Sequence, residues 1–213
     1  MVGTPSGLLQ EFARGRAGFL ADFHAAKHAR HFLTSGSMGT MGFGLPAAIG
    51  AQLARPECRV ICVSGDGSIM MNLQELQTIV GLDIPIKIFV LNNDGYHSIR
   101  QAQQNHFADN IVGCGPDSGL TFPDFQRLAA GFGISASHAA NDKDLAGAIR
   151  AALAGDGPHL CEVMIDKRQQ FAPKLSSRRL EDGSMVSSPL EDLVPFISDA
   201  ELEAAMEPCG TLR

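Results

Sequence analysis

Short apolar runs alternate with helical stripes between residues 44 and 165, and this alternation constrains the fold more than any other feature of the 213-residue chain. The run IKIFVL at 86–91 is typical of a strand that is covered on both faces, as in a parallel sheet. Strands that alternate with helices predict an α/β fold, a doubly wound parallel sheet flanked by helices. Strands are expected at 60–63, 86–91, 135–139 and 159–165, and helices at 45–53, 73–81, 124–132 and 144–153.

The two ends of the chain depart from this alternation. Apolar residues at 8–29 recur at helical spacings, which predicts a helical N-terminal segment. Four prolines and a charged run after residue 167 indicate an extended C-terminal tail or lid, with a short terminal helix near 199–206. We therefore expect three parts: a divergent helical segment at 1–33, a ligand-binding domain at 34–167 and a tail at 168–213.

Composition narrows the possible partners. A formal net charge of −6 argues against binding to nucleic acid or an anionic membrane, since both need a basic surface. Five cysteines without a CxxC pair indicate reduced, buried thiols. The apolar stretches are shorter than the roughly 18 residues that a membrane-spanning helix needs, and no secretory signal opens the sequence. We expect a cytoplasmic protein.

Two polar turns follow two of the expected strands. Gly65-Asp66-Gly67-Ser68 follows the run at 60–63, and Asn92-Asn93-Asp94-Gly95 follows the run at 86–91. Ligands of parallel sheets bind at the carboxyl ends of the strands, where both turns lie. They should therefore meet in space, although 26 residues lie between Asp66 and Asn93.

The residue types in these turns suit a divalent cation and an anion. Glycines let the backbone approach a ligand, and exposed N–H groups with the Ser68 hydroxyl suit a phosphate. An acid beside a phosphate site is favourable when a cation lies between them. Asp66, the Asn93 amide and the Gly95 carbonyl offer three oxygen ligands for Mg²⁺. Each motif alone is typical of a simple turn, and only their pairing favours the metal site.

Several segments extend this pairing. The sequence resembles the thiamine diphosphate-dependent enzymes similar to acetolactate synthase, over about residues 31–197. The resemblance rests on GSMGTMGFGLPAAIGA at 36–51, GDG at 65–67, NN at 92–93, YHSIR at 96–100, FAPK at 171–174 and PLED at 189–192. It implies decarboxylation of a 2-oxo acid followed by carboligation, with thiamine diphosphate and Mg²⁺ as cofactors.

The resemblance also implies roles for individual residues. Asp66 and Asn93 would bind Mg²⁺ by their side chains and Gly95 by its carbonyl. Met41 would support the bent cofactor between its two rings, and the Gly39 carbonyl would bond the aminopyrimidine. The expected contacts with the rest of the cofactor come from Gly65, Gly67, Ser68, Tyr96, His97 and Ser98.

The family's activating glutamate lies on a separate pyrimidine-binding domain, and no residue of this chain takes that role. Residues 1–30 also show no counterpart of the family's opening strand. We therefore expect a homo-oligomer or a separate pyrimidine-binding subunit, with little activity from the chain alone. The expected interface is an apolar patch of Leu45, Ile69, Met70 and Met71 near the site.

Two other functions stay open. The chain could be the small subunit of a two-gene 2-oxo acid decarboxylase, such as a sulfopyruvate or phosphonopyruvate decarboxylase. It could also be a non-catalytic remnant or interaction protein that keeps the fold. A nucleotide-binding Rossmann protein is less favoured, because the Gly-rich segment reads GxxGxG and no Walker lysine follows.

Overall fold

A computed structural model describes residues 6–11, 29–35, 39–107, 110–168, 177–180, 182–187, 198, 200 and 201. The chain forms two compact units. The first comprises Met1–Ala13 with His24–Gln169, and the second comprises Arg14–Phe23 with Gln170–Arg213. The first unit contains the sheet and the candidate site. Among the described helices, none is long and apolar enough to cross a membrane.

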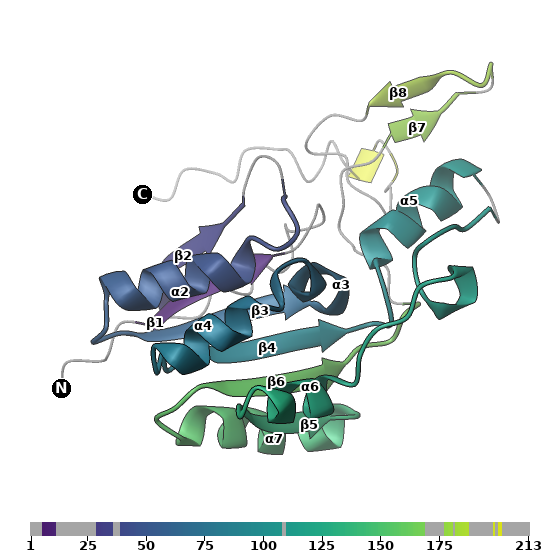
Figure 1. Ribbon diagram of the computed structural model, residues 1–213. Helices are drawn as coiled ribbons and strands as arrows, with labels where there is room; N and C mark the ends of the chain where they lie inside the picture. Colours follow the sequence, from purple (N-terminus) through teal and green to yellow (C-terminus); the bar gives the residue numbers. More distant parts are fainter. Residues whose placement is uncertain are drawn as a thin grey trace, which may run out of the picture. The chain divides into compact units, whose positions relative to one another are not determined.

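A six-stranded, wholly parallel sheet organises the first unit (Figure 1). Its strand order is β2-β1-β3-β4-β6-β5, so β3 and β4 lie side by side in the middle. The predicted parallel α/β fold is confirmed. The strands are β1 (Ser6–Glu11), β2 (Ala29–Thr34), β3 (Arg59–Gly65), β4 (Lys87–Asn92), β5 (Ser135–Ala139) and β6 (His159–Met164).

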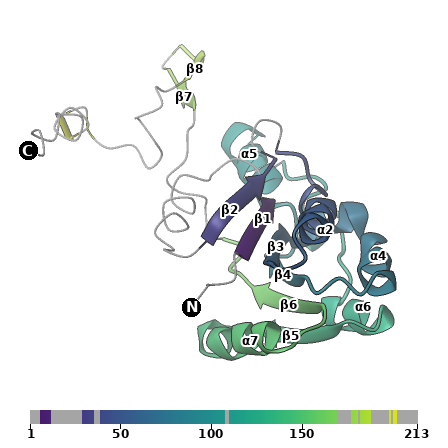
Figure 2. The same ribbon diagram turned by 90° about the vertical axis from the view of Figure 1, so that its left-hand side faces the viewer.

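Helices cover both faces of this sheet (Figure 2). Helices α2 (Gly44–Ala54), α4 (Glu75–Gly81) and α6 (Phe125–Gly131) share one core with β3, β4 and β6. Helix α7 (Asp142–Ala154) packs on the other face, against β5 and β6. The remaining helical segments are α3 (Asp66–Ile69), η1 (Met70–Asn72), α5 (His97–Phe107) and η2 (Pro116–Ser118).

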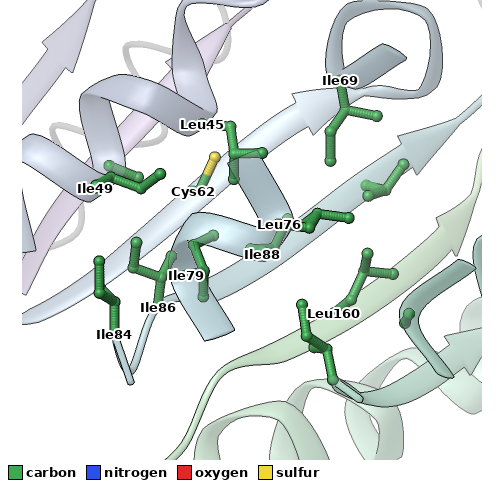
Figure 3. Packing of buried hydrophobic residues seen from close by; sticks show 14 of the residues in the cluster. Leu45, Ile49, Cys62, Ile69, Leu76, Ile79, Ile84, Ile86, Ile88 and Leu160 are labelled. Atoms are coloured by element: carbon green, nitrogen blue, oxygen red, sulfur yellow. The ribbon is translucent and has the colours of Figure 1, made fainter. Parts of the chain in front are cut away.

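The larger core explains why the chain folds this way (Figure 3). Alternate strand residues such as Cys62 and Ile88 point into it and are fully buried, as period-two patterning requires. Leu45 and Ile69 belong to this core, each with 1% of its surface exposed. They therefore cannot form the exposed patch that the sequence predicted, whereas Met71 is 46% exposed.

The helix predicted over Leu8 to Ala29 is wrong where the structure describes it. Ser6–Glu11 forms β1 and Ala29–Thr34 forms β2, while residues 12–28 lie outside the described part. Strand β1 pairs in parallel with β2 on one side and β3 on the other. The strand thought missing is thus present, because pairing on both edges overrides the helical spacing of a short leucine-containing segment.

The second unit contains a small antiparallel ladder in its described residues. Strand β7 (Ser177–Arg179) pairs with β8 (Met185–Ser187) across a turn that includes Gly183, whose φ is +83°. The tail is therefore more regular than predicted at this point. Residues 200 and 201 are helical, and the rest of the helix predicted at 199–206 lies outside the described residues.

Candidate functional site

The two polar turns meet at the carboxyl edge of the sheet. Strand β3 ends at Gly65, which is opposite Leu91 near the end of β4. The Asp66 carboxylate is buried between the turns, where its Oδ1 accepts a hydrogen bond from the Gly67 amide at 2.8 Å. Its Oδ2 accepts one from the Gly95 amide at 2.7 Å. The predicted approach of the two turns is confirmed.

Burial makes the charge of Asp66 unfavourable. Desolvation raises the pKa of its carboxyl group to about 6, although the two backbone hydrogen bonds act in the opposite direction. Each oxygen still has a lone pair, because each accepts only one of these backbone bonds. A divalent cation at this point would provide the missing opposite charge.

Asn93 supplies a second oxygen. Its Oδ1 is buried and accepts no hydrogen bond from any described residue. Such an unsatisfied acceptor costs about 1–3 kcal/mol, which a bound cation would offset. The preceding Asn92 differs from Asn93, because its Oδ1 already accepts the Asp94 amide at 3.0 Å. A carboxylate with an amide oxygen is a donor set that suits Mg²⁺.

Gly95 occupies a place where no side chain fits. Its φ is +140°, and an added Cβ would lie 1.8 Å from the carbonyl oxygen of Cys114. The same carbonyl accepts the Tyr96 amide at 2.8 Å. The Gly95 carbonyl accepts the His97 amide at 3.0 Å and keeps its second lone pair. Its role as the third metal ligand stays a prediction.

The Arg100 side chain stabilises the turn at 92–95 through hydrogen bonds to backbone carbonyls. Its Nη2 donates to the carbonyl of Asp94 at 2.9 Å and lies within 3.4 Å of the Cys114 carbonyl. Its Nη1 reaches the carbonyl of Lys167, after β6, at 3.5 Å. The sequence indicated no such function for Arg100, because its three acceptors are backbone groups that a motif cannot reveal.

Gly67 and Tyr96 are in direct contact across the two turns. A Cβ at Gly67 would lie 2.4 Å from Cε1 of Tyr96, so only glycine leaves room for this ring. Tyr96 also packs edge-to-face on Phe122, with ring centroids 5.8 Å apart. Ser68 is half-buried on α3, which Ile69 anchors in the core. Contact of these residues with a diphosphate stays a prediction.

The Gly-rich loop before α2 is tied to the same region. The Gly42 carbonyl accepts a hydrogen bond from Nδ2 of Asn72, which ends η1. An added Cβ at Gly42 would lie 2.7 Å from Cβ of Met71. Met41 is half-buried in this turn, and Gly39 is half-buried just before it with a φ of +59°. Their contacts with cofactor rings stay predictions.

Helix α5 extends the site beyond the second turn. His97 is buried, and Ser98 is half-buried, in its first turn. Gln101, one turn further, is 4% exposed, and its Oε1 accepts no hydrogen bond from a described residue. The sequence did not indicate Gln101, because its neighbours along α5 are mostly polar and give no sign that this side chain is buried.

The described residues contain no group of three or more His, Cys, Asp or Glu side chains that could hold a metal ion. The oxygens of Asp66 and Asn93, a carboxylate and an amide, are ligands that fit a hard cation.

Comparison with known proteins identifies the family. Residues 15–163 match the family described as "Thiamine pyrophosphate enzyme, C-terminal TPP binding domain". The match covers most of the chain, which therefore belongs to this family of thiamine diphosphate-binding domains, and the resemblance seen in the sequence is confirmed.

Curated relatives include large subunits of acetolactate synthase. The chain is 44% identical over 155 residues to "Acetolactate synthase isozyme 2 large subunit" of Escherichia coli (strain K12), which covers 70% of this chain and 28% of the relative. It is 40% identical over 148 residues to "Acetolactate synthase large subunit" of Pyropia yezoensis, covering 70% and 25%. It is 33% identical over 181 residues to "Acetolactate synthase 1, chloroplastic" of Zea mays, covering 83% and 27%. The chain thus spans about a quarter of the length of these relatives.

Proposed function

We propose that the chain supplies the diphosphate- and Mg²⁺-binding part of an active site similar to that of acetolactate synthase, acting on a 2-oxo acid. The observation that carries the proposal is the buried Oδ1 of Asn93, which has no hydrogen-bond partner among the described residues. It belongs to the turn that is bonded to the buried Asp66 carboxylate. The names of the relatives favour the synthase over the two-gene decarboxylase and the non-catalytic protein.

Each residue of the site has a defined part in this proposal. Asp66 and Asn93 hold the cation, which neutralises the phosphate charge beside a buried carboxylate. Gly67 lets the backbone approach the diphosphate. Met41 would pack against the bound cofactor between its two rings. When bound, thiamine diphosphate supplies an electron sink for decarboxylation of the 2-oxo acid and for joining the remaining fragment to a second carbonyl compound.

The proposal requires a group from outside residues 1–213. A glutamate that activates the aminopyrimidine is expected on a pyrimidine-binding domain of another subunit or segment. Buried Leu45 and Ile69 cannot contact such a partner, but the exposed side chains of Phe43 and Met71 can. We expect light scattering to show self-association, or a complex once a pyrimidine-binding partner is added.

Calorimetric titration with thiamine diphosphate tests the proposed function. We expect binding in the presence of Mg²⁺ and at least a hundredfold weaker binding after removal of divalent cations with a chelator. The chain alone should release no carbon dioxide from pyruvate. Equal affinity with and without Mg²⁺ would exclude the metal site, and carbon dioxide release by the pure chain would exclude the need for a partner.

A further inference from the structure

A buried carboxylate lies next to the proposed cation site. Glu162 on β6 is 7% exposed. Its Oε1 accepts Nδ2 of Asn92 at 2.7 Å. Its Oε2 lies 3.0 Å from Nδ1 of His138 and 3.4 Å from Nε2 of Gln126. These partners come from β4, β5 and α6, so Glu162 joins three elements around the end of β4.

The Glu162 carboxylate determines which way the Asn92 amide points. A carboxylate only accepts hydrogen bonds, so it can face the amide nitrogen of Asn92 but not its oxygen. The oxygen must then face the opposite side, where it accepts the Asp94 amide at 3.0 Å. The backbone carbonyl of Asn92 also accepts the Ile165 amide at 2.8 Å. Asn92 is therefore fixed by its side chain and its main chain together.

This arrangement sets the conformation of the turn that follows. Asp94 has a φ of +60°, which is unfavourable for a residue with a side chain. The Asn92 bond to its amide and the Arg100 bond to its carbonyl hold it there. Asn93 lies between these fixed residues, and its own oxygen stays unpartnered among the described residues.

We propose that Glu162 is a positioning residue for the cation: through Asn92 it fixes the Asp94 turn and thereby aims the Asn93 oxygen at the metal. This inference rests on the proposed function, because it assumes that Asn93 and Asp66 bind Mg²⁺. Glu162 touches neither ligand directly in the described contacts and acts only through the orientation of Asn92.

Three variants separate positioning from general stability. Glu162→Gln keeps an oxygen that accepts from Asn92 and should bind Mg²⁺ within about twofold of the unmodified chain. Glu162→Leu removes the acceptor, and we expect about tenfold weaker Mg²⁺ binding at saturating thiamine diphosphate. Asn92→Ala should cause a similar loss, and it keeps the test decisive if Glu162→Leu does not fold.

A matched control lies at the opposite edge of the sheet. Gln52 is 3% exposed, donates to the Cys58 carbonyl at 2.8 Å and accepts the Val60 amide at 3.3 Å. Gln52 lies on α2, and Gln52→Leu removes comparable buried hydrogen bonds at the start of β3, whereas the site lies at the end of that strand. It should lower the free energy of unfolding and leave Mg²⁺ affinity unchanged.

Hydrogen exchange at the Asp94 amide gives a readout in the absence of ligands. Measured by NMR under folded conditions, exchange at this amide should become about tenfold faster in Glu162→Leu and in Asn92→Ala, and remain unchanged in Gln52→Leu. Unaltered Asp94 exchange and Mg²⁺ affinity in Asn92→Ala would overturn the inference. Absence of Mg²⁺ binding by the unmodified chain would instead overturn the proposed function together with it.

Discussion

Buried polar groups differ in their hydrogen bonding between the two ends of the sheet. We call the end where the parallel strands begin the amino edge, and the end where they finish the carboxyl edge. At the amino edge, Nζ of the buried Lys87 donates to the carbonyls of Gly155 and Gly157, at 2.6 Å for Gly155. At the carboxyl edge, the Asn93 and Gln101 oxygens are buried with no donor among the described residues.

Burial favours the neutral form of the ionisable group at both edges: it lowers the pKa of the Lys87 ammonium group and raises that of the Asp66 carboxyl group. Each group also has two backbone hydrogen bonds that favour its charged form. Among the described residues, the unsatisfied buried oxygens of Asn93 and Gln101 therefore lie at the carboxyl edge, where we propose that the ligand binds.

The largest effect is expected at Asp66. Asp66→Ala removes the anionic ligand, so thiamine diphosphate affinity in Mg²⁺ should fall at least a hundredfold, to the value that the unmodified chain shows without metal. Calorimetry in both conditions measures this. An Asp66→Ala protein that still gains affinity from Mg²⁺ would show that the cation binds elsewhere.

A substitution at the amino edge should change the stability of the fold but not cofactor affinity. Lys87→Met removes the donor to the Gly155 and Gly157 carbonyls, and we expect the free energy of unfolding to fall by about 1–3 kcal/mol. Urea denaturation measures the loss, and cofactor affinity should not change. A weakened cofactor affinity in this variant would contradict the separation of the two edges.

Gly67 tests the contact between the two turns. Gly67→Ala places a Cβ against the Tyr96 ring and should weaken cofactor binding about tenfold by displacing that ring. Gly147→Ala on α7 is the control: its Cβ would meet nothing within 4 Å, so it should stabilise the fold by about 0.5–1 kcal/mol. Equal cofactor affinity in the two variants would show that the position of the Tyr96 ring does not affect cofactor binding.

Near neutral pH, protonation of Asp66 should give the smallest effect on affinity. Its pKa of about 6 in the ligand-free chain means that protons compete with Mg²⁺ below that pH. Mg²⁺ affinity should fall about twofold from pH 7 to pH 6 and about fivefold more from pH 6 to pH 5, since the ionised fraction of Asp66 falls accordingly. Calorimetry across this range checks the profile, and constant affinity down to pH 5 would contradict it.

Local patterns in the sequence predicted much of this fold. Strands β3 to β6 and helices α2, α4, α6 and α7 lie where apolar periodicity placed them. Helix α5 was missed because its sequence, HSIRQAQQNHF, is strongly polar. Strand β1 was missed because its pairing with β2 and β3 depends on tertiary contacts.

The candidate site also has features that the sequence predicted and features that only the structure shows. The meeting of Asp66 with the second turn follows from two motifs at the ends of parallel strands. The bond between Glu162 and Asn92 depends on the register of β4 against β6, which pairs residues about 70 positions apart. A local pattern carries no information on that register, so the role of Glu162 emerges only from the structure.

The contact between Gly67 and Tyr96 also has a spectroscopic consequence. The chain has no tryptophan and a single tyrosine, so its tyrosine emission comes from one ring at the junction of the two turns. Tyrosine emission of the unlabelled protein therefore reports on this junction. The proposed metal binding at the carboxyl edge could thus be followed in real time without an attached dye.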